Sequence, residues 1–474
     1  MRHRVRRRCS YCSKLRDGGT GAVGAVIERR KSSAVMGTTG VNTPQSHLVR
    51  AIGRWTLTAL MLNTIIGSGF GGLPSLLAAR LGRLSPAGFL LAAPGVGLIA
   101  ACLAEVASQF QQTGGPYLYA RIAFGRFMAI QICWLAWLSR ITAASAAADL
   151  FVSYLAQFFP VVEVSAARAL VLTLLIGFLA IVNYRGVSQG ARVSNLFTVT
   201  KLLVLGFFIC GGVFALLFRP EIRINQPTVP IDAADWFEAI LLMTYAYGGF
   251  EAALFVAGET DDARKDAPVA LLVALITSTI LFVSVQYVVV NTLPNAASST
   301  RPAADAAGRF WGPTGASLIA IGTLIALYGY LSANMLHTPR LTFAMGERAD
   351  FPAAFAAVHS RFRTPSVSIV TFAVMLVIFA TIGSYRWNVT LTAVSRLLIY
   401  GSIVAALPVL RRTSATVDAF RLPHATVIVT LALAFTGALV TRMDSRGFGV
   451  VLGTIALAGL NWAWARTRPT TDLP

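Results

Sequence analysis

Long apolar stretches recur along the chain after residue 54, and short polar or basic segments separate them. Most stretches have about 20 residues, the length that an α-helix needs to cross the hydrocarbon core of a bilayer. Apolar runs of this length predict membrane-spanning helices. We expect about twelve spans, near residues 55–79, 86–108, 127–159, 167–184, 193–218, 236–257, 268–291, 314–337, 365–383, 389–410, 424–440 and 448–464.

Polar, glycine-rich sequence interrupts two of these spans. The first span contains residues 63–74 (NTIIGSGFGGLP), and the sixth contains residues 245–251 (YAYGGFE). A helix in lipid satisfies its backbone groups internally, and gives this up only where the freed groups face protein, water or a ligand. Paired interruptions in matching positions of two halves indicate the central site of a secondary transporter. Close helix packing is the alternative explanation for the glycines.

Composition agrees with a membrane protein. The 474 residues are 55% hydrophobic and only 13% charged, whereas soluble chains carry about 25% charged residues. No soluble domain longer than a loop fits between the spans. The predicted fold class is therefore an all-α integral membrane protein.

The distribution of Lys and Arg predicts the orientation, because positive residues are retained on the cytoplasmic side. With the N-terminus inside, the inner loops and both tails hold 28 of the 40 Lys and Arg residues, and the outer loops hold 10. We expect a multi-pass protein of the inner (plasma) membrane that contacts the lipid bilayer and has both termini in the cytoplasm.

Residues 1–50 form a basic N-terminal tail. Residues 1–54 carry 12 Lys and Arg and have no apolar run that would make a signal peptide or a span. Binding to anionic lipid or nucleic acid is one explanation of this charge. We favour a disordered tail or a gene start placed too early, so no nucleic acid partner is expected. Cys9 and Cys12 form a lone CxxC pair, which predicts no metal site by itself.

Four motifs resemble those of the amino acid–polyamine–organocation (APC) superfamily of permeases. Residues 63–74 are similar to the first-helix signature of that family. Residues 112–117 (QTGGPY) and 258–268 (GETDDARKDAP) resemble its turns after spans two and six, and residues 338–348 (TPRLTFAMGER) match after span eight. The matches are collinear over roughly residues 55–410 and identify the chain as similar to bacterial amino acid transporters.

The resemblance implies the leucine-transporter (LeuT) fold, in which spans one to five and six to ten form two inverted repeats. The first repeat would comprise residues 51–220 and the second residues 233–410. Residues 422–466 would add two peripheral spans, followed by a C-terminal tail at residues 467–474.

The two interruptions together could bind both charged ends of an α-amino acid through the backbone. Amides near Ser68, Gly69 and Phe70 would begin a half-helix, whose N-terminal end attracts a carboxylate. Carbonyls near Tyr245, Ala246 and Tyr247 would end another half-helix, which suits an ammonium group. The candidate substrate-binding residues are Ile65, Gly67, Ser68, Gly69, Tyr245, Ala246, Gly248 and Phe250.

Apolar and aromatic residues near the interruptions predict a neutral or hydrophobic substrate. Tyr245 and Phe250 flank the second interruption, and Gly248 leaves room where a bulky residue would shrink the pocket. Aromatic residues in membrane helices also serve packing, which is the alternative for each of them. Further candidate lining residues are Trp137, Ile141, Tyr328 and Tyr330.

Ionisable residues inside spans are costly and are therefore candidates for function. Removal from water disfavours the charged form of Lys201 in the fifth span, so this residue can change protonation during transport. In several APC transporters a lysine in this span takes the place of a sodium ion. Snorkelling to the inner surface is the alternative. Glu251 matches a family glutamate linked to gating or protonation, and a fixed hydrogen bond to unwound backbone is its alternative.

Other charged residues inside spans need partners that the sequence does not identify. Arg140 and Asp149 lie in the third span and Arg396 lies in the tenth. Arg396 requires an acidic or carbonyl partner. Glu105, near the inner end of the second span, is expected to be structural.

These features favour a secondary active transporter that imports an amino acid by proton symport with alternating access. An amino acid/amine exchanger is the nearest alternative. A membrane-embedded enzyme or a channel is more distant, because no nucleophile–base pair is found and two broken helices imply alternating gates. The chain has no P-loop, and its five histidines have no metal-ligand spacing. We expect no enzymatic activity and no cofactor; the amino acid, the coupling stoichiometry and the oligomeric state stay open.

Overall fold

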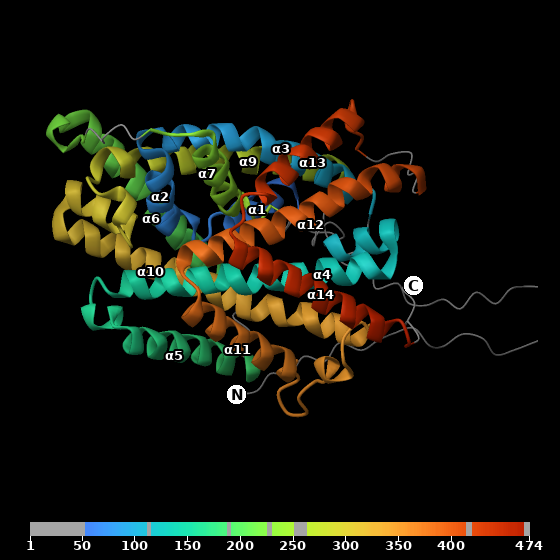
Figure 1. Cartoon of the computed structure of the whole chain (residues 1–474). Coiled ribbons are helices and arrows are strands. Elements are labelled where there is room, and N and C mark those ends of the chain that lie inside the picture. Colours follow the sequence, from blue (N-terminus) through green and yellow to red (C-terminus); the bar gives the residue numbers. More distant parts are fainter. Residues whose placement is uncertain are drawn as a thin grey trace, which may run out of the picture. The chain divides into compact units, whose positions relative to one another are not determined.

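The computed structural model describes residues 53–110, 115–186, 191–224, 230–250, 263–413 and 420–468. Every regular element in these ranges is a helix, which confirms the predicted all-α fold class (Figure 1). The α-helices are α1 (Arg54–Ile65), α2 (Gly69–Leu81), α3 (Ser85–Ser108), α4 (Gly115–Leu155), α5 (Ser165–Tyr184), α6 (Ala191–Phe218), α7 (Ala233–Tyr247), α9 (Ala263–Thr292), α10 (Pro302–Glu347), α11 (Ser366–Ile382), α12 (Tyr385–Thr413), α13 (Ala425–Val440) and α14 (Ser445–Ala465). Short 3₁₀ helices are η1 (Gly82–Leu84), η2 (Pro160–Glu163), η3 (Pro220–Ile222), η5 (Ala296–Ser298) and η6 (Ala353–Ala356).

The described helices overlap the predicted spans, although several of their ends differ. α1 and α2 together make the first span, α6 is the fifth and α12 is the tenth, while α7 is the described part of the sixth. Within the described ranges, eight helical stretches are long and apolar enough to cross a membrane, and α11 and α13 are shorter apolar helices.

Two helices begin well before the predicted spans. α4 starts at Gly115 and not near residue 127, and α10 starts at Pro302 and not near residue 314. In both, a short first segment meets the long helix at a glycine with positive φ, 82° at Gly125 and 68° at Gly312. The short segments contain arginines, so the apolar pattern that marks a span does not extend into them.

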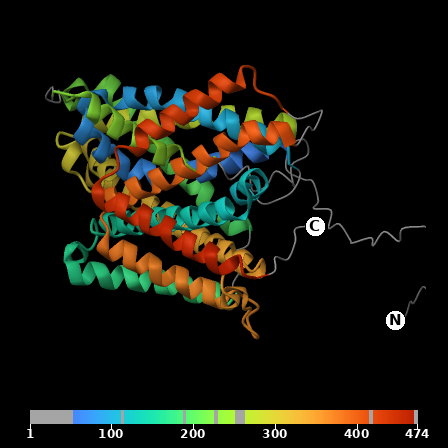
Figure 2. The same ribbon diagram turned by 45° about the vertical axis from the view of Figure 1, so that its right-hand side comes forward.

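Helices that are distant in the sequence pack beside the interrupted spans. α4 contacts α10 and α12, while α1 lies against α9 and α2 lies against α7. α5 and α11 run next to each other in both ribbon views (Figures 1 and 2). Buried small residues of α4, such as Ala144 and Ala147, permit close helix contacts in a membrane protein. The contact of α2 with α7 brings the two interrupted spans together.

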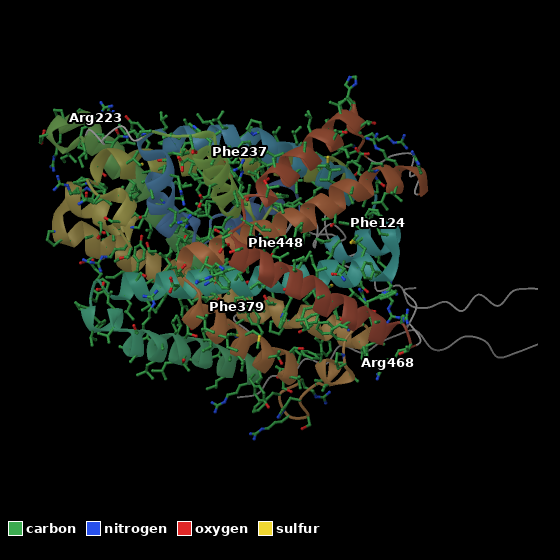
Figure 3. The ribbon with its side chains drawn as sticks, in the orientation of Figure 1. Phe124, Arg223, Phe237, Phe379, Phe448 and Arg468 are labelled. Carbon is green, nitrogen blue, oxygen red and sulfur yellow. The ribbon has the colours of Figure 1, made fainter. Side chains whose placement is uncertain are left out.

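Large apolar side chains lie on the outward faces of the helices. Phe124, Phe237 and Phe448, which are labelled in Figure 3, are 38%, 37% and 53% exposed. Exposing such groups to water costs about 25 cal/mol per Å² of apolar area, whereas acyl chains are as apolar as leucine. These faces therefore suit contact with lipid.

A buried carboxylate joins the start of α4 to the segment after α10. Asp350 accepts hydrogen bonds from the Tyr117 hydroxyl (2.6 Å) and Arg126 Nε (2.7 Å). Asn461 of α14 donates from Nδ2 to the Asp350 carbonyl (2.8 Å) and accepts at Oδ1 from Trp134 Nε1 (2.9 Å). Because a buried charge is costly unless it is paired and hydrogen-bonded, these contacts fix α4, α10 and α14 to one another.

Glu105, expected to be structural, joins α3 to α12. Arg411 donates from Nε and Nη2 to its two carboxylate oxygens at 2.6 and 2.7 Å. The Leu422 N–H donates to the same carboxylate at 2.9 Å. A bidentate arginine–carboxylate pair is strong and fixes geometry, in agreement with the structural role.

Candidate functional site

The first break separates α1 from α2, where the glycine pattern predicted an interruption. α1 ends at Ile65 and α2 begins at Gly69. Between them, Ile66 leaves helical geometry (φ −76°, ψ 72°), and the Gly67 N–H donates to the Ile65 carbonyl (2.8 Å). None of the described side chains caps the start of α2. Because a helix leaves its first N–H groups without intrahelical partners, this end can offer donors to an anion.

The second break follows α7. This helix begins at a capping box formed by Asp232 and Asp235, and it ends at Tyr247. Gly248 is extended, and Gly249 has a φ of +119°, a conformation that favours glycine. The last carbonyls of a helix carry partial negative charge. The end of α7 can therefore offer acceptors to a cation.

The two breaks are in direct contact. A Cβ atom at Gly249 would lie 2.8 Å from the Thr64 carbonyl, so the chain after α7 passes against the end of α1. Both the φ angle and the available space exclude a side chain at this position. A Cβ atom at Gly69 would lie 3.5 Å from Ala246, an ordinary van der Waals distance. The start of α2 and the end of α7 thus lie beside each other.

A hydrogen bond between side chains also joins the breaks. Ser68 Oγ and the Tyr245 hydroxyl are 2.5 Å apart, and both residues are buried. Tyr385 of α12 donates from its hydroxyl to the Ser68 carbonyl at 3.5 Å. Ser68 and Tyr245, which the sequence suggested separately as substrate contacts, therefore belong to one polar cluster.

Aromatic side chains fill the space that some of the glycines leave. A Cβ atom at Gly72 would lie 2.5 Å from the Tyr385 ring, and one at Gly71 would lie 3.2 Å from Leu150. The Tyr154 hydroxyl donates to the Gly71 carbonyl at 2.8 Å. Close packing, the alternative explanation of the glycines, accounts for these two positions. Tyr154 and Tyr385 were not among the expected site residues, because nothing in their neighbouring sequence distinguishes them from packing aromatics.

The expected lining residues lie at different distances from the breaks. Tyr330 of α10 is beside Gly67, where a Cβ atom would lie 3.4 Å from its ring. Tyr328 packs instead on Phe197 of α6, with ring centroids 5.7 Å apart. Tyr330 is thus brought to the first break, whereas the ring contact of Tyr328 is with α6.

Lys201 of α6 lies at the carbonyl end of the first break. Its Nζ donates a hydrogen bond to the Asn63 carbonyl in the last turn of α1. The residue is 8% exposed. Snorkelling would carry its amine to the inner surface, whereas the amine instead reaches the first break. A role in coupling stays a prediction. Glu251, the other coupling candidate, lies outside the described residues.

Arg396 of α12 lies at the carbonyl end of the second break. Its Nη1 donates to the Tyr245 carbonyl at 3.3 Å, and its guanidinium carbon lies 5.8 Å from the centre of the Tyr245 ring. A Cβ atom at Gly248 would lie 1.8 Å from Nη1. The space that Gly248 was expected to leave for the substrate holds this guanidinium group. The partner that the sequence could not identify for Arg396 includes a backbone carbonyl.

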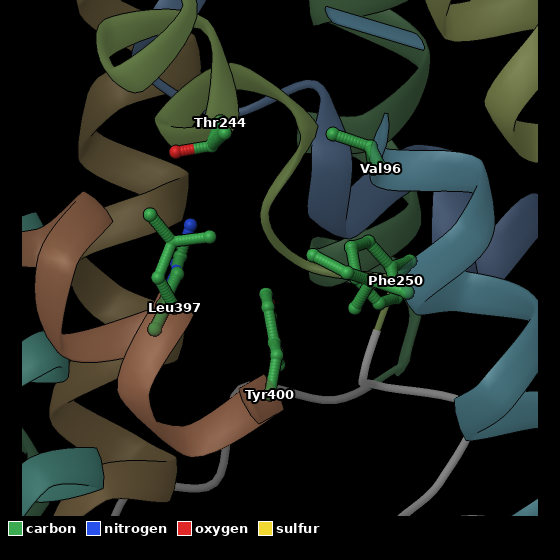
Figure 4. A pocket seen from close by; sticks show the side chains of 7 residues that line it. Val96, Thr244, Phe250, Leu397 and Tyr400 are labelled. Carbon is green, nitrogen blue, oxygen red and sulfur yellow. The ribbon is translucent and has the colours of Figure 1, made fainter. Parts of the chain in front are cut away.

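A cavity beside the second break has a volume of about 10 Å³, near the minimum of about 10–15 Å³ that a water molecule needs. In Figure 4, Phe250 and Val96 face Thr244 and Leu397 across it. The Phe250 ring packs on Tyr400, with centroids 4.9 Å apart. An amino acid therefore requires these side chains to move. The cavity is lined by Val96, Ile99, Thr244, Phe250, Arg396, Leu397 and Tyr400.

Ion pairs join the same helices on the side expected to face outward. Arg80 of α2 lies 3.0 Å from Glu238 and 3.5 Å from Asp235 of α7. Arg386 of α12 also pairs with Glu238. A cavity of about 530 Å³ lies next to Glu238 and Arg386, within the usual size range of small-molecule pockets. Room for a substrate thus exists beside this charge cluster, while the breaks themselves are closed.

Among the described residues, the polar groups at the breaks include backbone amides and carbonyls, hydroxyls and two cations. These groups can bind a charged ligand through hydrogen bonds, and a proton can pass along such hydrogen bonds. In the part of the chain that the structure describes, no three His, Cys, Asp or Glu side chains gather closely enough to hold a metal ion.

The sequence is similar to those of several known transporters. The sequence model of the amino acid permease family matches residues 52–456. The branched-chain amino acid permease BcaP of Bacillus subtilis is 28% identical over 416 residues, which cover 82% of this chain and 87% of that protein. The serine/threonine exchanger SteT of the same organism is 27% identical over 442 residues, covering 89% and 97%. Cationic amino acid transporter 4 of Mus musculus is 27% identical over 389 residues, covering 77% and 60%.

The matched region contains both breaks and most of the described helices. These relatives are transporters, and the described helices form an all-α membrane protein with a LeuT-like fold, as the resemblance implied. The chain therefore belongs to the amino acid permease family of the APC superfamily.

Proposed function

We propose that this protein is a secondary active transporter that imports a neutral or hydrophobic amino acid by proton symport with alternating access. The observation that carries the proposal is the contact between the two breaks, which sets the N–H end of α2 beside the carbonyl end of α7. These ends complement the carboxylate and the ammonium of an α-amino acid.

The backbone is proposed to bind the zwitterion. Amides at Ser68 and Gly69 receive the carboxylate, with Ile65 and Gly67 forming the turn before them. Carbonyls near Tyr245 and Ala246 receive the ammonium, once the closed site opens. Backbone recognition leaves the substrate side chain to be selected by its surroundings.

An apolar wall supports a neutral substrate. Phe250, Leu397 and Val96 surround the cavity at the second break, and burying apolar surface there favours an apolar side chain. The relative BcaP is named for branched-chain amino acids. We infer that the side chain of the substrate contacts Phe250.

Lys201 supports proton coupling. An amine on the Asn63 carbonyl places a positive charge at the first break, where it would repel a sodium ion. Lysine can release its proton when it is desolvated. Loss of that proton would weaken the link between α6 and α1 and allow α1 to move. Glu251 is proposed to assist gating or protonation.

Alternating access requires the closed site to open on each side in turn. The outer cluster of Arg80, Glu238 and Arg386 is proposed to separate when the site opens outward. With the basic tail retained inside, both termini lie in the cytoplasm and the protein resides in the plasma membrane.

Exchange of one amino acid for another is the second candidate. It is favoured by two relatives that are named as a serine/threonine exchanger and a putative arginine/ornithine antiporter. An exchanger turns over only when substrate is present on both sides of the membrane, so the two candidates differ in a direct measurement.

The test is leucine uptake into proteoliposomes under an imposed pH gradient, acidic outside. We expect accumulation that rises as the external pH falls, collapses with a protonophore and changes little when choline replaces Na⁺. Vesicles without internal amino acid should still accumulate leucine. Strict sodium dependence, or uptake only into preloaded vesicles, would contradict proton symport.

A further inference from the structure

Arg396 is a cation held where the proposed cycle requires the cationic end of the substrate. Its Nη1 donates to the Tyr245 carbonyl at 3.3 Å, and this carbonyl is one of those assigned above to the substrate ammonium. The C-terminal end of a helix attracts cations because of its unpaired carbonyls and its dipole. The guanidinium group therefore uses an acceptor that a bound amino acid would need.

The first break has a matching arrangement. Lys201 donates to Asn63 and Arg396 donates to Tyr245, and each acceptor is the third residue from the end of its helix, α1 or α7. The two cations also come from corresponding spans of the expected repeats, because α6 is the fifth span and α12 is the tenth. Two inverted repeats with this arrangement would each hold a cation on a broken helix.

The two cations differ in one property. A desolvated lysine can release its proton, whereas a guanidinium group stays charged in proteins. Arg396 also occupies space that depends on glycine, because a Cβ atom at Gly248 would lie 1.8 Å from Nη1. The second break thus holds a permanent positive charge, which leaves the carbonyl only when the side chain moves.

We propose that Arg396 is a specificity-determining residue that takes the place of the substrate ammonium in the closed site and excludes amino acids with positively charged side chains. The inference rests on the proposed function, because it takes the breaks as the amino acid site. A neutral amino acid displaces the guanidinium group from Tyr245 with its own ammonium. A lysine-like substrate brings a second cation beside Phe250 and Leu397, where apolar walls screen like charges poorly.

The family alone does not settle this selectivity. Relatives of similar identity are named for branched-chain amino acids, for serine and threonine, and for cationic amino acids. Selection among these classes therefore requires a determinant at the level of single residues. Arg396 is a charged side chain at the wall of the cavity, which suits it to this choice.

Ligand binding to purified protein tests the proposal without any ion gradient. L-norleucine and L-lysine share a carbon chain and differ in the terminal ammonium group, and a ligand that binds the native state raises its thermal stability. We expect the wild-type protein to bind lysine at least about tenfold more weakly than norleucine. Arg396→Gln keeps a hydrogen-bond donor without the charge and should remove most of this difference. Arg396→Lys keeps the charge and should retain the difference.

Arg412→Gln is the matched control, because it removes an exposed positive charge from the last turn of the same helix. It should leave the preference for norleucine unchanged. Arg396→Met replaces the glutamine variant if that variant does not fold. Equal binding of lysine and norleucine by the wild-type protein, or an unchanged preference in the neutral variant, would overturn the proposal. Binding of no amino acid at all would refute the proposed function and this inference with it, whereas binding without proton coupling would refute only the symport.

Discussion

At the first break the carbonyl end of α1 receives the amine of Lys201, and at the second the carbonyl end of α7 receives the guanidinium group of Arg396. The acceptors, Asn63 and Tyr245, occupy the same position relative to the ends of their helices. The arrangement is shared, but the donors have different acid–base chemistry. A titratable cation suits coupling to protons, and a permanent cation suits selection among substrates.

The side chains that surround the two breaks also differ. At the first break, aromatic side chains pack against the glycines, as Tyr385 does at Gly72. The second break borders a cavity whose wall includes Phe250 and Leu397. We infer that the first break supplies fixed donors for the carboxylate, while the second adapts to the substrate side chain.

Replacing Lys201 by arginine makes the first break resemble the second, and it should have the largest effect. With one proton per substrate, a gradient of about one pH unit can drive about tenfold accumulation. Because arginine keeps its proton, Lys201→Arg should lower the accumulation ratio to about one while exchange across preloaded vesicles persists. Lys201→Ala should likewise lose accumulation and keep exchange. Full accumulation by either variant in the leucine uptake assay would exclude Lys201 from coupling.

Gly69→Ala tests the carboxylate end of the first break and should have the next largest effect. Ordinary contacts of 3.4 Å to Leu73 and 3.5 Å to Ala246 leave room for a Cβ atom, so the variant should fold. The added methyl group blocks close approach to the amides of α2. Loss of one hydrogen bond to a charged group, about 1.5–3 kcal/mol, should weaken leucine binding about tenfold to hundredfold.

Gly177→Ala on α5 is the matched control for that substitution, since a Cβ atom there meets open space. It should bind leucine like the wild-type protein. Thermal unfolding of both variants separates a binding defect from a folding defect. Wild-type affinity in a folded Gly69→Ala variant would remove this amide from the site.

Phe250→Leu tests the adaptable wall of the second break and should have the smallest effect. The smaller side chain enlarges the space beside Tyr400 and Leu397. A substrate side chain that fills this space gains about 25 cal/mol of binding free energy per Å² of apolar surface buried. We expect the order of preferred substrates to shift toward bulkier side chains by a few-fold, without a loss of proton coupling. Competition of phenylalanine and valine against leucine uptake measures this shift. An unchanged order with unchanged rates would place Phe250 outside the pocket.

Local rules predicted the breaks because their causes are local. Glycine-rich sequence at residues 63–74 predicted an interruption, and the structure ends α1 at Ile65 and begins α2 at Gly69. Lys201 and Arg396 could be singled out because a charge inside a span requires a function or a partner. The identity of these partners could not be predicted, since Arg396 and Tyr245 lie 151 positions apart.

The polar starts of two helices were also beyond the sequence pattern. α4 extends back to Gly115 through Arg121 and Arg126, and Arg126 is held by Asp350, 224 positions away. A hydropathy pattern reports the part of a helix that meets lipid, whereas distant contacts decide how far the helix continues. The role of Tyr385 could not be predicted for the same reason, because it depends on a contact with Gly72, which is distant in the sequence.

The contacts of Asn461 have a consequence for how the chain is made. Its side-chain amide hydrogen-bonds to both Trp134 and Asp350. Asn461 follows Asp350 by 111 residues in the sequence. At a synthesis rate of about 5–20 residues per second, the ribosome completes this distance in roughly five to twenty seconds. Until then the carbonyl of Asp350 and the indole of Trp134 lack their final partner. The last helix, although peripheral to the breaks, thus supplies the final partners of these two groups. A chain that ended before it would leave them without these hydrogen bonds.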